Sequence, residues 1–128
     1  MTLIFYPISG GKLGSMVKNL PVLLLTTTGR KTGIVRTVPL GYFMDGKAYV
    51  LTASNGGSDS HPSWYLNLNG NPDTTIEVGS QKIKVSASVV PQEQRTSLWE
   101  TLLSKAPGYK QYENSTLRQN PLVQLTPR

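Results

Sequence analysis

Residues 21–43, PVLLLTTTGRKTGIVRTVPLGYF, hold two runs of strand-forming residues on either side of a short turn. The first run, Val22 to Thr28, is apolar and then β-branched, and the second, Val35 to Phe43, combines Val and Thr with aromatic residues. These residue types favour strands. Gly29 and Gly33 lie between the runs, where glycine is typical of a turn. The stretch therefore predicts two paired strands.

The rest of the chain continues with short strands and few helices. Asp45-Gly46 and Gly79-Ser80 are hairpin signals. The expected strands are 22–28, 35–43, 48–53, 74–78, 81–90 and 122–125, and the expected helices are 62–68 and 91–106, with an irregular or helical piece at 109–118. The longer helix is predicted by an apolar stripe of Leu98, Trp99, Leu102, Leu103 and Ala106. The pattern predicts a mainly β (α+β) fold, a small mixed or antiparallel barrel with one long helix.

Length and composition limit the possible classes of protein. A chain of 128 residues with 38% hydrophobic and 16% charged residues has the size and composition of one globular domain. Residues 1–128 are therefore expected to form a single domain, in which 1–20 has no predicted element and Trp64 and Trp99 belong to the core. The chain has no Cys and a single His, which excludes thiolate metal sites and Cys nucleophiles and disfavours His-based triads.

The sequence contains no segment typical of membrane insertion or secretion. Its longest apolar runs, Leu3 to Tyr6 and Val22 to Leu25, are far shorter than the ~20 residues that cross a bilayer. The N-terminus lacks the basic and long apolar regions of a secretory signal, so the protein is expected to be cytoplasmic. Peripheral contact with a membrane stays open.

Positive charge is concentrated in the first third of the chain. The whole chain has thirteen Lys and Arg against seven Asp and Glu, a net charge of +6. Residues 1–47 hold six of these cations against Asp45 alone, a net of +5, and the other 81 residues add only +1. This distribution favours an anionic partner near the first third, such as nucleic acid, anionic lipid or a phosphorylated cofactor.

The turn between the first two strands has the composition of an anion site. Arg30 and Lys31 stand between Gly29 and Gly33, and Arg36 follows in the next strand. Glycine permits backbone conformations that aim successive N–H groups at one point, and such nests bind anions. A solvated hairpin turn is the alternative. The spacing does not match a P-loop.

Two further segments have residue types that contact ligands. Residues 54–57, Ser-Asn-Gly-Gly, directly follow a predicted strand, and they form either a ligand-facing loop or a plain turn. Tyr109 and Tyr112 lie three residues apart, so their phenols share one face if the segment is helical. Tyr rings pack against flat apolar ligands, but on this spacing alone ordinary surface or core packing is the favoured interpretation.

Taken in order, these motifs resemble the deazaflavin-dependent nitroreductase family, the coenzyme F420-dependent quinone and nitro reductases with a split β-barrel of the FMN-binding-protein type. The matching text is Leu24 to Gly33 (LLTTTGRKTG), Arg36, Pro39-Leu40, Ala53 to Gly57 (ASNGG), Pro62, Trp64-Tyr65, Asn67-Leu68 and Asn71-Pro72. Residues 21–80 match closely, and the resemblance continues more loosely to Tyr112.

The resemblance implies an oxidoreductase that transfers a hydride from reduced F420 to an electron-poor acceptor such as a quinone, enone or nitroaromatic. It implies that Arg30, Lys31, Thr32 and Arg36 hold the phosphate and oligoglutamate tail. The ring and linker would lie against Val38, Pro39, Leu40, Gly41, Thr52, Ala53, Ser54, Asn55, Ser63, Trp64, Tyr65 and Asn67. Ser54, Tyr109 and Tyr112 would face the acceptor as catalytic groups, with no metal. Ala106 replaces a Tyr of the nitro-activating branch, so activity on bulky nitroaromatics is not expected.

Other readings of the same residues remain. An FMN-binding oxidoreductase of the same fold would need the turn cations for one phosphate only. A nucleic-acid-binding barrel is disfavoured, because no aromatic residues alternate with the turn cations to stack on bases. A carrier that binds the deazaflavin without turnover is a third possibility. Pairing into a homodimer also stays open.

Overall fold

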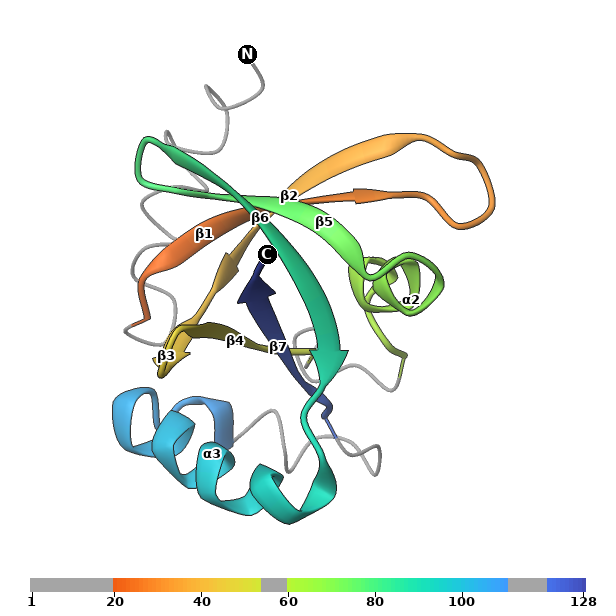
Figure 1. Cartoon of the computed structure of the whole chain (residues 1–128). Helices are drawn as coiled ribbons and strands as arrows, with labels where there is room; N and C mark the ends of the chain where they lie inside the picture. The colour runs from red at the N-terminus through yellow and green to blue at the C-terminus, as the bar shows by residue number, and fades with distance from the viewer. Residues whose placement is uncertain (1–19, 54–59, 111–119) are drawn as a thin grey trace.

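The strands form one curled antiparallel sheet in a computed structural model that describes residues 20–53, 60–110 and 120–128. The sheet has seven strands in the order β2-β1-β5-β6-β7-β4-β3 (Figure 1). These are β1 (Val22–Thr28), β2 (Val35–Gly41), β3 (Phe43–Asp45), β4 (Ala48–Thr52), β5 (Asp73–Val78), β6 (Gln81–Val89) and β7 (Leu122–Pro127). Each neighbouring pair is antiparallel. The expected mainly β barrel is confirmed as a split β-barrel.

The two edges of the sheet are joined through one residue, Tyr42. The predicted single strand 35–43 is wrong, because β2 ends at Gly41 and β3 begins at Phe43. The Tyr42 amide donates a hydrogen bond to the Pro21 carbonyl at 3.0 Å, which ties this corner to the start of β1. Since β2 and β3 stand at opposite ends of the strand order, their direct connection requires the sheet to curl round on itself.

The predicted hairpin turns are confirmed. Asp45 pairs with Ala48 around a turn in which Gly46 has φ 61°, and Val78 pairs with Gln81 around Gly79 with φ 60°. Positive φ in a two-residue turn matches the twist of the flanking strands, and glycine adopts it without steric cost.

Strands β4 and β7 are buried on both faces. Val50 and Leu122 belong to a core cluster with α3, whereas Leu51 and Val123 belong to a second cluster inside the curled sheet. At these positions consecutive apolar residues therefore point into two different cores, whereas from Val123 to Thr126 apolar and polar residues of β7 alternate.

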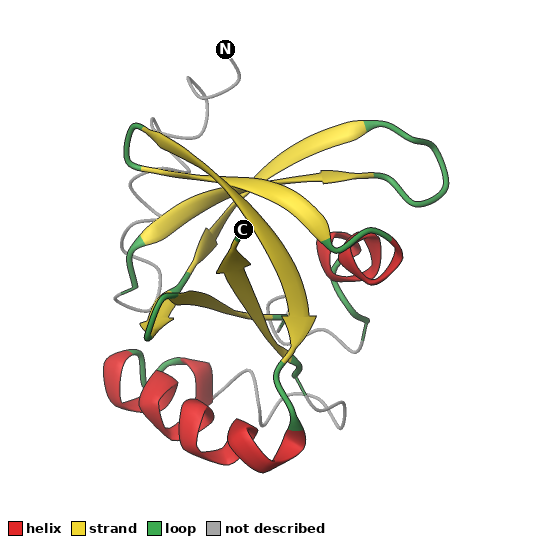
Figure 2. Ribbon diagram, in the orientation of Figure 1, coloured by secondary structure: helices red, strands yellow, loops and turns green. Residues whose placement is uncertain are grey.

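Two described helices cover the sheet at different places (Figure 2). α2 (Ser63–Gly70) lies beside the β1–β2 hairpin, and α3 (Gln92–Lys105) packs across β3 and β4 (Figure 1). The predicted stripe on α3 is confirmed, since Leu98, Trp99 and Leu102 are buried and Leu103 packs against them. Trp64 is buried as well, as expected. No helix in the described part of the chain is long and apolar enough to cross a membrane.

Candidate functional site

The turn between β1 and β2 carries three exposed cations. It reaches out beyond the curled sheet on the side of α2 (Figure 1), and Arg30, Lys31 and Arg36 are exposed there. None of the three forms an ion pair with a carboxylate of the described residues, among which Arg128 pairs with Asp73. The turn therefore presents three uncompensated positive charges to solvent.

The backbone amides of both turn glycines bond within the turn. The Gly29 amide donates to the Ile34 carbonyl at 2.8 Å, and the Gly33 amide donates to the Gly29 carbonyl at 2.9 Å. The Ile34 amide donates to Thr32 Oγ1 at 3.2 Å. A Cβ at Gly29 would lie 2.7 Å from the same Oγ1, so a side chain there would require Thr32 to move. The amides of Gly29, Gly33 and Ile34 close the turn itself and are not available to an anion.

Arg30 is held against α2 by Asn67. The Arg30 backbone N–H and its Nη1 both donate to Asn67 Oδ1, at 3.2 Å and 3.0 Å. Asn67 Nδ2 in turn donates to Thr27 Oγ1 at 3.1 Å. Asn67 and Thr27 are each 6% exposed. The structure thus joins two of the residues singled out in the sequence, Arg30 and Asn67, and adds Thr27, whose role no sequence motif indicated.

The far end of β2 meets Tyr109, which lies four residues beyond the last residue of α3. A Cβ built at Gly41 would lie 3.7 Å from the Tyr109 hydroxyl and 3.2 Å from Leu20 Cβ. Tyr109 is 6% exposed and belongs to the cluster with α3. Seven residues of strand span about 20 Å, so Gly41 and Tyr109 lie at the opposite end of β2 from the turn cations.

The remaining residues implied by the resemblance occupy three elements. Val38 and Leu40 are half-buried on β2 and Pro39 is exposed, while Ala53 is fully buried after β4. On α2, Ser63 is exposed, Tyr65 is half-buried and Trp64 is buried. Ser54, Asn55 and Tyr112 lie outside the described residues.

Thr52 has a buried hydroxyl without a partner. Its Oγ1 is inaccessible to solvent and makes no hydrogen bond. Most buried polar atoms are hydrogen-bonded, so an exception needs an explanation. Side-chain atoms of Trp99 and Asn120 share this property, so the buried hydroxyl alone does not identify Thr52 as a ligand contact.

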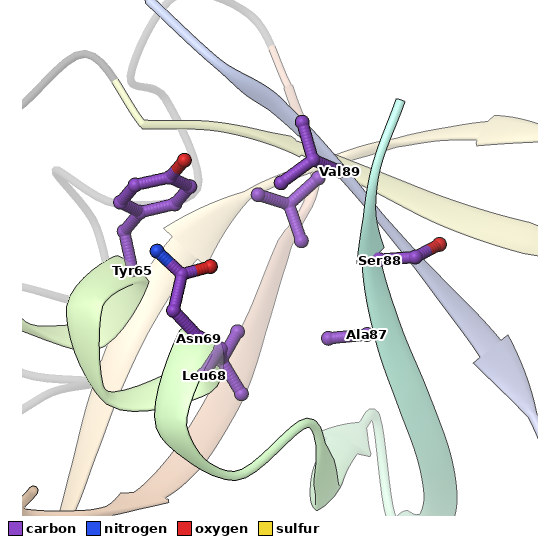
Figure 3. A pocket seen from close by; sticks show the side chains of 7 residues that line it. Tyr65, Leu68, Asn69, Ala87, Ser88 and Val89 are labelled. Carbon is purple, nitrogen blue, oxygen red and sulfur yellow. The ribbon is translucent and has the colours of Figure 1, made fainter. Parts of the chain in front are cut away.

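A small cavity lies between α2 and β6. Tyr65, Leu68 and Asn69 of the helix face β6 across it (Figure 3). Its volume is about 20 Å³, which is room for roughly one water molecule. The cavity is therefore too small for an organic ligand.

A larger cavity adjoins the corner at Tyr42. Its volume is about 480 Å³, and the described residues that line it are Leu20, Pro21, Tyr42, Phe43, Met44 and Lys105. This volume is in the range of small-molecule sites. Leu20 also faces Gly41, so the cavity lies one residue away from the Gly41–Tyr109 contact. No sequence motif predicted this cavity, because its lining residues belong to the residues just before β1, the break between β2 and β3, and the end of α3, which are far apart in the sequence.

Burial, together with the neighbouring Tyr49, raises the pKa of Tyr42 above its usual value of 10.0. The two rings lie 5.6 Å apart. A raised folded-state pKa contributes stability that is fully present below pH 10 and is lost as the pH rises through the folded-state pKa. We expect the free energy of unfolding to fall more steeply above pH 10 in the unmodified protein than in Tyr42→Phe. Urea unfolding between pH 8 and 11 measures this difference, and parallel curves would contradict it.

Comparison with known proteins gives consistent results. The model of the F420H(2)-dependent quinone reductase family matches residues 2–127. An F420H(2)-dependent quinone reductase of Mycobacterium tuberculosis H37Rv is 40% identical over 124 residues, which are 94% of this chain and 83% of that protein. The solved structure of an F420-H2-dependent reductase, FDR-A, is 34% identical with a TM-score of 0.73, covering 82% of this chain and 93% of that one. A structure described as a domain-swapped dimer is 29% identical with a TM-score of 0.74, covering 97% and 98%.

Proposed function

The chain belongs to the F420H(2)-dependent quinone reductase family, and from this premise we propose that it transfers a hydride from reduced F420 to a quinone. The enzyme is thus an oxidoreductase with a small-molecule acceptor. Residues 1–128 would act as one cofactor-binding domain.

The observation that carries this proposal is the set of three uncompensated cations at the β1–β2 turn. Arg30, Lys31 and Arg36 have no acidic partner among the described residues, and charge-assisted contacts to phosphate or carboxylate groups are strong. A phosphate followed by several glutamates offers an anion to each cation. FMN offers a single phosphate, so the charge of the turn favours the longer anionic tail.

We place the rest of the cofactor along β2 and towards β4 and α2. The ring and linker contacts proposed are Val38, Pro39, Leu40, Gly41, Thr52, Ala53, Ser54, Asn55, Ser63, Trp64 and Tyr65, with Thr32 beside the tail. The turn cations and Gly41 stand at opposite ends of β2, which suits an elongated molecule.

When bound, reduced F420 supplies the hydride, so the protein has to position the acceptor and stabilise the charge that develops on it. We propose that a phenol at the Gly41 end donates a hydrogen bond to the acceptor oxygen. Tyr109 is the described candidate, and Ser54 and Tyr112 are the others. The cavity of about 480 Å³ beside Leu20 is the proposed space for a flat apolar quinone.

Tyr109→Phe should lower kcat by about 10- to 100-fold, because it removes one donor to the developing negative charge. Affinity for the cofactor should stay within about twofold, because the ring of the side chain is kept. Steady-state kinetics with a quinone, together with a binding titration, measure both quantities. Tyr49→Phe on β4 is the matched control and should retain the unmodified kinetics. Equal kcat values for both variants would remove Tyr109 from the mechanism.

The function itself is tested by titrating the protein with oxidised F420 and, separately, with FMN while Trp64 and Trp99 fluorescence is followed. Anaerobic oxidation of reduced F420 by menadione is then measured by absorbance. Salt-sensitive binding of F420 in preference to FMN, with quinone-dependent oxidation, is the expected result. Binding without turnover would identify a carrier, and preference for FMN would overturn the cofactor assignment.

We also propose a homodimer, because the 29% identical structure is described as a domain-swapped dimer. Light scattering coupled to size-exclusion chromatography measures the mass of the assembly. A mass equal to the 14.0 kDa chain would contradict this assignment.

A further inference from the structure

Arg30 is restrained by a neutral side chain where a carboxylate would be the usual partner. Both of its hydrogen bonds to α2 end on the same atom, Asn67 Oδ1, at 3.2 Å and 3.0 Å. A carboxylate in that place would accept the same bonds and cancel the charge. The amide restrains the guanidinium and leaves its positive charge intact.

The Asn67 amide is held in one orientation from both sides. Its Nδ2 donates to Thr27 Oγ1 at 3.1 Å, and its Oδ1 accepts from Arg30. Turning the amide by 180° would place its NH2 group against the Arg30 donors, where no hydrogen bond can form. Since Asn67 is 6% exposed, water offers little compensation for such a turn.

The hydrogen bonds that join Thr27, Asn67 and Arg30 form a clamp, and the β1–β2 side of this clamp carries only positive charge. The segment 22–41, which contains β1, the turn and β2, holds Arg30, Lys31 and Arg36 and no acidic residue. In the β1–β2 register Thr27 stands opposite Arg36. The clamp therefore lies inside the proposed anion-binding end and adds no negative charge to it.

We propose that Asn67, oriented by Thr27, is a positioning residue that holds the Arg30 guanidinium ready for the anionic tail of the cofactor without neutralising it. This inference rests on the proposed function. A long flexible side chain normally loses rotamer freedom when it binds a ligand. Because Arg30 is already tied to α2, much of that loss has occurred before the cofactor arrives. Asn67 thus acts through Arg30 and needs no contact of its own with the cofactor.

Asn67→Asp tests the inference. The Asp side chain has the shape of Asn and can accept the same hydrogen bonds from Arg30, but its carboxylate neutralises the positive charge of the guanidinium. We expect the Kd for oxidised F420 to rise by about tenfold or more and to depend less on salt, because one ion contact is lost. The KM for reduced F420 should rise, while kcat at saturating cofactor should change by less than about twofold. Asn69→Asp on the same helix is the matched control, because it adds the same charge at an exposed residue, whereas the α2 side chain that accepts from Arg30 is Asn67.

A second pair of variants covers the case in which Asn67→Asp does not fold. Thr27→Val removes the acceptor that orients Asn67 and should weaken F420 binding by about three- to tenfold, whereas Thr27→Ser should restore the unmodified Kd. A wild-type Kd and salt dependence in Asn67→Asp, or in Thr27→Val, would overturn the inference while the function stands. Failure of the unmodified protein to bind F420 would overturn the proposed function and this inference together.

Discussion

Replacing Arg30 and Lys31 together with alanine should weaken the binding of oxidised F420 by about 100-fold, or about 3 kcal/mol. Each side chain can make one charge-assisted contact to the tail. Neither forms an ion pair with an acidic residue of the described part of the chain. The dissociation constant should also become less sensitive to salt, because fewer ions are paired. Fluorescence titrations at two salt concentrations measure both effects.

The control variant for this experiment also removes two positive charges, but at positions outside the β1–β2 turn. Lys47 and Lys82 are both exposed and belong to the β3–β4 turn and to the start of β6. Both of these parts of the sheet lie away from the β1–β2 turn (Figure 1). The double variant Lys47→Ala with Lys82→Ala should bind F420 within about threefold of the unmodified protein, since screening weakens distant charges. Similar losses in the two double variants would show that net charge, and not the turn, binds the tail.

The order of the elements was predictable because their signals are local. Asp45-Gly46 and Gly79-Ser80 each require only a short turn with positive φ, and both glycines have it, at 61° and 60°. The apolar stripe of α3 likewise depends on spacing within one helix. The basic residues of the β1–β2 turn were visible for the same reason.

The closure of the barrel and the clamp on Arg30 were not predictable, because each depends on residues far apart in the chain. Residues 35–43 look like one strand, but β2 pairs with β1 whereas Phe43 pairs with Val50 of β4 at the other end of the strand order. Asn67 and Thr27 are joined across 40 positions. The glycines suggested a backbone nest, but the turn uses those amides for itself, and only three-dimensional contacts reveal this.

The strand that carries the turn depends on the core beneath it, and Leu25→Ala tests this dependence. Leu25 is fully buried in the middle of β1, where it pairs with Val38 of β2 and Ile76 of β5. Truncation removes apolar contacts and leaves a cavity, so the free energy of unfolding should fall by about 2–5 kcal/mol. Urea unfolding measures the change. Val35→Ala, at a side chain that is 63% exposed on β2, should cost less than about 0.5 kcal/mol.

Leu25→Ala also distinguishes the folding stability of the core from cofactor binding at the β1–β2 turn. A ligand that binds the folded state alone stabilises it by an amount set by its concentration and Kd, about 2.7 kcal/mol at 100 times the Kd. If Leu25 supports the strand without touching the cofactor, F420 should stabilise Leu25→Ala and the unmodified protein by the same amount. In the Arg30→Ala and Lys31→Ala double variant the added F420 should give little stabilisation, although its starting stability should be close to that of the unmodified protein. An equal response to F420 in all three proteins would mean that the tail binds elsewhere.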